Sequence, residues 1–468
     1  MILRIFRERL TLVLLALLPF HAFAVTVATR LIAGPGKSPL PVLALWKEAL
    51  LGIILLLALL EIIRSHFPSP GASRHPLPMG EGRGRGNFDV IDVVIVIFIF
   101  LGLVVSFLTH GDLTLMLLGF KYDFIPLIAF IILRRVPWSG AFSDTIYRAI
   151  IIVGSLVAAY GVLSFFLPQG FFTAIGYSDL HSLYLPDAPI AAFQQIGGSG
   201  LRRIQSVMSG PNQLGLWLLL PWTLGLLQVL KGEKFARWAS FFVLIDIALF
   251  LTFSRSAWIA ACVIVALVLL KDMGTPFMRK MLMSMVSVFA LGVVVVAFVA
   301  PQVLLRQAST RDHLLRPLQA IQLMREQPVG YGLGTAGPAS NRTSDPCVHL
   351  PDGSDVSWAI PHPELCVFLG GYQVQPSDRE CNCPVLPENW YLQIGVETGV
   401  LGFVLFVALI VLVLRKIFKA RDELGHAIAL SFLGISVAAL FLHAWEDSAV
   451  AFTLWILLTN GLSRDISV

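Results

Sequence analysis

The stretch Glu388-Asn389-Trp390-Tyr391-Leu392-Gln393 decides the fold, together with Gly399-Val-Leu-Gly402 and the apolar run 403–414 that follows it. A polar segment, 301–390, ends here and an apolar segment begins. About 20 consecutive apolar residues cross the roughly 30 Å hydrocarbon core of a membrane as a helix. The stretch therefore predicts a spanning helix with a carboxylate and an amide at its boundary.

The composition extends this prediction to the whole chain. Hydrophobic residues make up 56% of the sequence and charged residues 13%, with a mean hydropathy of +0.79. In soluble domains, about a quarter of all residues are charged. We predict an all-α, polytopic transmembrane bundle of about twelve spans, because long apolar runs recur without the alternation of a barrel. The spans begin near residues 10, 40, 89, 114, 146, 212, 238, 257, 281, 391, 427 and 448.

Basic residues predict the orientation of these spans, since loops rich in Lys and Arg stay in the cytoplasm. All such loops fall on one side of the twelve-span plan, and both termini fall with them. Residues 1–300 then hold nine spans, with a cytoplasmic linker at 64–88 and an outer loop at 168–210. A large outer loop covers 301–390, and 391–468 hold the last three spans. The net charge of +5 needs no nucleic-acid partner.

Four of the five cysteines lie in the large loop: Cys347, Cys366, Cys381 and Cys383. In an oxidising compartment they favour disulfides, and three connectivities are open. The alternative is a metal site that includes His349 and His362, but the irregular spacing is not typical of a zinc site.

Arginines outside the predicted membrane region gather near span ends: Arg202, Arg203, Arg255, Arg311, Arg316 and Arg325. Guanidinium groups bind phosphate oxygens in a bidentate fork and keep their charge, so this arrangement suits a phosphate at the membrane surface. Contact with lipid headgroups is the alternative for any one of them.

Charged residues also fall within spans: Lys47 with Glu48, and Lys121 with Asp123. Such charges are either paired or functional. Residues two apart on a helix point to different sides, so we expect Lys121 and Asp123 to meet other helices rather than each other.

Two segments of the large loop have local signatures. Ser309 to Glu326 predicts a surface helix that is kinked or restarts near Arg316, because Pro317 interrupts it. Gly332-Leu-Gly334-Thr-Ala-Gly337 matches the G-x-G-x-x-G pattern of dinucleotide-binding domains. We reject this interpretation, because no strand is predicted before it. These glycines are expected to allow a sharp turn or a close approach to a ligand.

Glu388 is the candidate general base, and Asn389 is positioned to hold it or to bind a sugar hydroxyl. The alternative is a helix cap, because Glu and Asn are both favoured at the start of a helix.

The segment Glu388 to Gly402 resembles the signature of the O-antigen ligase and polymerase superfamily, with Asn389, Gly399 and Gly402 at the matching spacing. Three further segments are similar in order and kind: Arg203 to Gly215 with Gly210-Pro-Asn212, Leu251 to Ala257 with Ser254-Arg-Ser256, and Gly330 to Thr335. The resemblance covers the chain from about the fourth span to the C-terminus.

The resemblance implies a GT-C-like, inverting glycosyltransferase of the bacterial inner membrane that uses no metal or cofactor and acts on the periplasmic face. Its donor would be a glycan on undecaprenyl pyrophosphate, and its acceptor lipid A-core, a growing glycan or a protein. It assigns Arg203 and Arg311 to the pyrophosphate and Glu388 to the acceptor, as catalytic residues. Substrate-binding positions would be Asn389, Arg255, Arg202, Arg316, Lys121 and Asn212.

The chain departs from the ligase pattern at Glu388, where ligases have His and polymerase-like members carry an acidic residue. Two other function classes remain open. A transporter of small ions or solutes would use the charges within the spans, and a non-catalytic envelope protein would need none of these residues.

Overall fold

The computed structural model describes residues 2–66, 89–109, 111–178, 189–192, 196, 201–270, 307–350, 352–420 and 422–463, with scattered positions between 280 and 298. The side chains of 307–312 and of Ser463 are not described. Most of the linker 64–88, parts of the loop 168–210, and most of the ninth span predicted from residue 281 lie outside the described residues.

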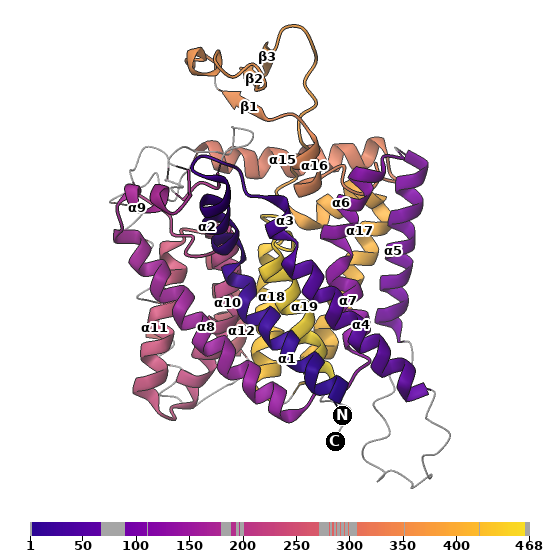
Figure 1. Ribbon diagram of the computed structural model, residues 1–468, viewed down its shortest axis with the longest axis vertical. Helices are drawn as coiled ribbons and strands as arrows, with labels where there is room; N and C mark the ends of the chain where they lie inside the picture. The colour runs from indigo at the N-terminus through magenta and orange to yellow at the C-terminus, as the bar shows by residue number, and fades with distance from the viewer. Residues whose placement is uncertain are drawn as a thin grey trace.

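The described chain is mostly helical (Figure 1). The helices of the bundle are α1 (Ile2–Leu17), η1 (Leu18–Phe20), α2 (His21–Ala33), α3 (Pro41–Ala44), α4 (Trp46–His66), α5 (Val90–Thr109), α6 (Leu113–Asp123), α7 (Ile125–Leu133), α8 (Gly140–Phe166), α10 (Pro211–Lys231), α11 (Phe235–Leu251), α12 (Arg255–Leu270), α17 (Trp390–Ile417), α18 (Glu423–Ala438) and α19 (Ser448–Ser463). Three further helices are α9 (Gln169–Ala174), α15 (Gln307–Glu326) and α16 (Gly337–Thr343).

Among the described residues, 6 helices are long and apolar enough to cross a membrane, or 7 if the bent pair α6 and α7 is one span. The prediction of a mostly helical membrane protein is confirmed at this level. The count of about twelve spans and the GT-C-like arrangement stay predictions.

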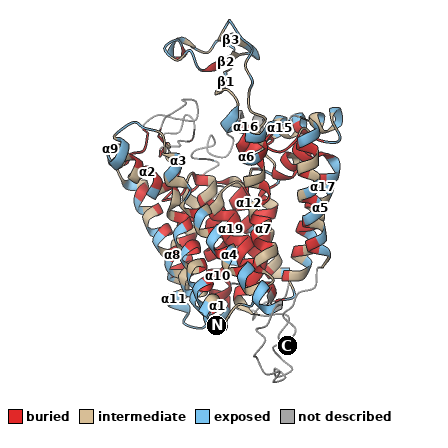
Figure 2. Cartoon of the chain, turned by 45° about the vertical axis from the view of Figure 1, so that its right-hand side comes forward, coloured by how far each residue is buried: buried red, intermediate tan, exposed pale blue. Residues whose placement is uncertain are grey.

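Helix α10 lies at the centre of the bundle and is buried along nearly its whole length (Figure 2). It packs against α11, α12 and α18. A helix that is apolar on every side and buried is typical of a bundle core. The outer helices instead expose large apolar side chains, such as Phe107 at 68% and Phe166 at 75%. Such surfaces suit contact with lipid rather than water.

The two ends of the bundle differ. Helix α1 begins and α19 ends at the same end, which we call the terminal end (Figure 1). At the opposite end, the loop end, α15 lies across the helices and packs against α17. Helix α15 is one helix from Gln307 to Glu326 with Pro317 inside it, so the predicted restart near Arg316 is wrong, and the alternative of a kink stays a prediction. A proline removes one backbone hydrogen bond, and a half-exposed helix tolerates this loss because water can replace it.

A three-stranded sheet projects from the loop end (Figure 1). Strand β1 (Cys347–Leu350) pairs parallel to β2 (Cys366–Leu369), which pairs antiparallel to β3 (Tyr372–Gln375). The all-α prediction is consistent with the bundle, and this small sheet in the large loop was not predicted. Strands of four residues carry too short a pattern to read from the sequence.

Candidate active site at the loop end

Glu388 lies at the junction between the large loop and α17, and α15 supplies its partner. Arg316 Nη1 lies 2.8 Å from Glu388 Oε1, and His313 Nδ1 lies 3.8 Å from Glu388 Oε2. Residues three apart share a helix face, so α15 points both side chains at the start of α17. The structure therefore places the predicted base in an ion pair with the predicted phosphate ligand Arg316.

Asn389 serves as the cap of α17. Its Oδ1 accepts a hydrogen bond from Leu392 N at 3.0 Å, and its Nδ2 donates to Leu440 O at 3.0 Å. A side chain that caps a helix satisfies one of the backbone donors left open at the N-terminus. Asn389 thus has the structural role that the sequence left as an alternative, and it also fastens the α18–α19 loop to α17.

The α18–α19 loop, residues 439–447, brings titratable groups that the sequence did not single out. His443 Nδ1 lies 2.7 Å from Gln393 Oε1, one turn below Asn389 on α17. Burial lowers the pKa of His443 to about 4, and the positive charges of Arg316 and His313 act in the same direction. The imidazole is therefore neutral near pH 7 and close to the Glu388–Arg316 pair.

Glu446 and Asp447 end the same loop. Burial raises the pKa of Glu446 to about 7, and the charges of Asp447 and Glu388 add to this effect, while Arg342 opposes it. Asp447 Oδ2 accepts a hydrogen bond from Ser209 at 2.6 Å. Only the short spacing His-Ala-Trp-Glu-Asp between two spans signals this group in the sequence.

A second set of charges from α4 and α6 adjoins this loop. Lys121 Nζ lies 2.8 Å from Glu48 Oε1, and Lys47 Nζ lies 3.0 Å from the same atom. Lys121 thus meets another helix, as expected. Arg342 of α16 lies over the ring of Tyr122, 5.7 Å from its centroid. Ammonium and guanidinium groups thus come from three elements.

Arg203 is buried and has a positioning role. Its Nε donates to Thr252 O at 2.9 Å, and its Nη2 donates to Asn212 Oδ1 at 2.7 Å. The two predicted site residues Arg203 and Asn212 therefore meet each other. They also join the turn before α10 to the turn before α12, which are two of the segments that carried the family resemblance.

Arg202 and Arg255 have contacts in other parts of the bundle, and the side chain of Arg311 is not described. Arg202 donates to Leu167 O at 2.7 Å and lies over Phe172, so it fastens the end of α8. Arg255 begins α12 and lines an apolar hollow of about 500 Å³ together with Trp258 and Cys262. Arg311 lies in α15, but its side chain is outside the described side chains.

The glycine-rich turn 330–337 packs against α17. Helix α17 is broken at Gly399, where φ is +74°. Gly332 N donates to the freed carbonyl of Glu397 at 2.8 Å. A Cβ atom on Gly399 would overlap the backbone carbonyl of Pro328, so only glycine allows this approach. The close approach expected of these glycines is thus to a helix.

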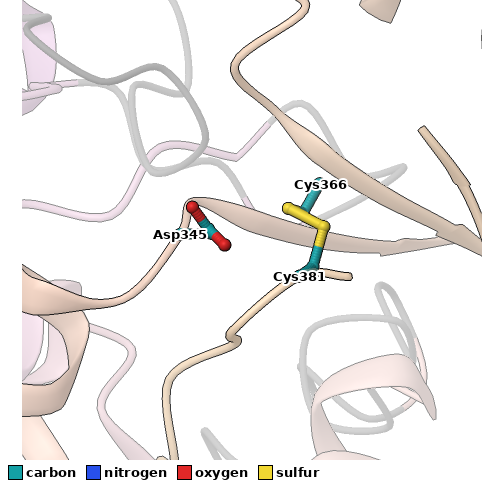
Figure 3. A group of neighbouring side chains, drawn as sticks. All are labelled: Asp345, Cys366 and Cys381. Carbon is teal, nitrogen blue, oxygen red and sulfur yellow. A yellow bond between two sulfur atoms is a disulfide. The ribbon is translucent and has the colours of Figure 1, made fainter. Parts of the chain in front are cut away.

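The four loop cysteines form two disulfides, Cys347–Cys383 and Cys366–Cys381. Asp345 lies beside the second pair (Figure 3). Sulfur in a disulfide is not a thiolate ligand. Asp345 is already bonded to Arg379 at 2.7 Å and to Asn382 N at 2.9 Å. This group therefore does not support a metal site.

At the loop end, the described side chains combine a carboxylate, a neutral imidazole and several cations, which is a set able to bind an anion and accept a proton. No protein-family model matches the chain, and no curated protein matches it.

Proposed function

We propose that the protein transfers a glycan from undecaprenyl pyrophosphate to an acceptor hydroxyl at the loop end. The observation that carries the proposal is the meeting of Glu388 with Arg316 at the start of α17. A transferase of this kind needs cations where negative charge develops on the leaving pyrophosphate. It also needs a group that orients the acceptor hydroxyl beside them.

In this proposal the pyrophosphate lies between α15 and the cations of α6 and α16. Arg316, Arg342 and Lys121 are its ligands among the described side chains, and Arg311 of α15 remains assigned to it by resemblance. Arg203 acts through position, because both of its bonded groups belong to the protein. Glu388 binds the acceptor hydroxyl once the pyrophosphate competes for Arg316.

The test is deletion of the protein from its host, followed by analysis of the lipid-linked glycan pool. The proposal expects glycans to accumulate on undecaprenyl pyrophosphate: long chains for a ligase and single repeats for a polymerase. Arg316→Ala and Glu388→Gln should fail to restore the wild-type pool at equal protein level. Glu326→Gln, an exposed carboxylate of the same helix, should restore it. An unchanged pool after deletion would refute the proposal.

One observation favours a second candidate, an ion-coupled transporter. The α6–α7 pair bends by 47° just after Asp123, and α17 breaks at Gly399. Asp123 and Glu397 at these breaks are both buried, and their carboxyl groups interact electrostatically. Discontinuous spans that meet at acidic groups are typical of transporters. Proteoliposomes that move Na⁺ or H⁺ with the wild type and not with Asp123→Asn would establish this candidate, and absence of both fluxes would remove it.

A further inference from the structure

His443 is held in one orientation by residues of α17. Its Nδ1 contacts Gln393 Oε1 at 2.7 Å, and Gln393 is only 1% exposed. Gln393 in turn packs on the backbone of Gly337, where a Cβ atom would overlap the amide. An amide oxygen is an acceptor, so Nδ1 carries the hydrogen and Nε2 has the free electron pair.

Nε2 of His443 is one of the buried polar atoms of this region without a partner among the described residues. It is enclosed, and no donor or acceptor of the described residues lies within hydrogen-bond distance of it. A buried polar atom without a partner costs free energy comparable to a lost hydrogen bond. The charges that act on this imidazole are those of Arg316 and His313 of α15.

The α18–α19 loop is fixed to the start of α17, so this placement is part of the fold. Trp390 N donates to Ala439 O at 2.9 Å, and Asn389 Nδ2 donates to Leu440 O at 3.0 Å. Gln393 follows Asn389 by four positions and lies on the same helix face. His443 therefore lies beside the first turns of α17, where the charges of Arg316 and His313 reach it.

Glu388 is poorly suited to take a proton itself. A carboxylate that is already paired with a guanidinium gains less from protonation than an unpaired base does. A neutral imidazole with a free electron pair has no such competitor. A pyrophosphate that binds Arg316 would also remove the positive charge that opposes protonation of this imidazole.

We propose that His443 is a further catalytic residue, whose Nε2 accepts the proton of the acceptor hydroxyl when donor pyrophosphate draws Arg316 away from Glu388. The inference rests on the proposed glycan transfer. The acceptor O–H bond breaks and its proton moves to Nε2. The oxygen forms the new bond to the anomeric carbon, and the bond from that carbon to the phosphate oxygen breaks. Its electron pair leaves with the pyrophosphate, beside the cations.

The first experiment measures access to Nε2 without any transfer. The purified full-length protein is treated with diethyl pyrocarbonate, which modifies unprotonated imidazoles, and each histidine peptide is followed by mass spectrometry. The inference expects His443 to react slowly alone and at least about tenfold faster with inorganic pyrophosphate present. His362, which lies in the disulfide-bonded loop, is the internal control and should not change. A His443 rate that pyrophosphate leaves unchanged would overturn the inference.

The second experiment measures transfer, with lipid-linked glycans extracted from the deletion strain as donor. His443→Ala should lower kcat by about 100-fold or more and leave the donor KM within about threefold. Free imidazole should raise the kcat of His443→Ala at least about tenfold. The increase should be proportional to the unprotonated fraction of the imidazole. In His443→Asn, the amide can still donate a hydrogen bond to Gln393, so this variant controls for misfolding. It should be as slow as His443→Ala.

The outcomes separate the two proposals. If the wild type transfers glycan and both His443 variants are equally fast, the role of His443 is overturned and the proposed function stands. A slow variant that imidazole does not rescue would also overturn it, because a structural role predicts that result. No transfer by the wild type would overturn the proposed function, whatever the reactivity of His443.

Discussion

The two ends of the bundle use the same residue types in opposite ways. At the terminal end, two acids each lie between two cations: Asp89 pairs with Arg134 and Lys416, and Asp92 with Arg134 and Arg135. These pairs join the start of α5 to the ends of α7 and α17. At the loop end, burial outweighs the nearby charge of Arg342 at Glu446, and one nitrogen of the His443 imidazole has no partner among the described residues.

The difference teaches which charges stabilise the fold and which are available for a substrate. Burial opposes the ionisation of Asp89, but hydrogen bonds from Lys416 and Arg134 lower its pKa below the usual range. At the loop end, burial dominates and favours the uncharged form of Glu446, whose pKa it raises to about 7. Satisfied ion pairs gain nothing from a ligand, whereas an unsatisfied group can bind one.

The sharpest way to break this comparison is to remove the loop-end ion pair. Arg316→Ala should lower glycan transfer by about 100- to 1,000-fold, because one cation fewer meets the developing charge. The unfolding temperature should change little, since the side chains of both partners are about a quarter to a third exposed. Transfer assays and thermal unfolding in detergent measure the two quantities. A large drop in unfolding temperature with transfer per folded molecule unchanged would place this pair among the stabilising ones.

The matching change at the terminal end should show the reverse pattern. Arg134→Ala leaves the buried carboxylate of Asp92 and the partly exposed carboxylate of Asp89 with one cation fewer, and breaking a buried pair such as that of Asp92 destabilises a protein by about 3–5 kcal/mol. Transfer per folded molecule should stay near the wild-type value. Replacing Asp89 and Asp92 by Asn in the same protein should recover part of the stability, because no unpaired charge then remains.

The projecting sheet is a third kind of region and tests whether the loop end is stabilised as one unit. Replacing Cys366 and Cys381 by Ser should destabilise the sheet by about 2–4 kcal/mol. The bundle should keep its unfolding temperature, because the sheet stands away from it (Figure 1). Hydrogen exchange of β1 to β3 against exchange of α17 measures both. Loss of protection in α17 would show that the two regions unfold together.

The sequence predicted the helices but not how their ends meet. Apolar runs identify spans one at a time, so α5, α8, α10 and α17 could be placed from length and hydropathy. The contact of α15 with α17 joins Arg316 to Glu388 across 72 positions, and no local pattern contains such a pairing. Glu388 could be found because it marks a boundary in hydropathy. His443 could not, because a short connection between two spans looks the same with or without a function.

The smallest effect expected is in the pH dependence of stability, where two loop-end groups oppose each other. The folded protein holds the Glu446 proton up to about pH 7 and the unfolded chain only to about 4.5, so Glu446 lowers stability as pH rises between these values. His443 loses its proton near pH 4 when folded and near 6.5 when unfolded, so it raises stability over that range.

The two slopes roughly cancel between about pH 4.5 and 6.5 in the wild type. Relative to the wild type, His443→Gln should therefore lose stability as pH rises through this window, and Glu446→Gln should gain it. Unfolding temperatures recorded at half-unit pH steps give both difference curves. The difference curve for Asp89→Asn should instead fall as pH rises toward about 4 and stay flat above it, because the ion pairs lower the pKa of Asp89 from its unfolded value near 3.8 and stabilise the ionised carboxylate. Parallel curves for the two carboxylates would remove the distinction between the two ends of the bundle.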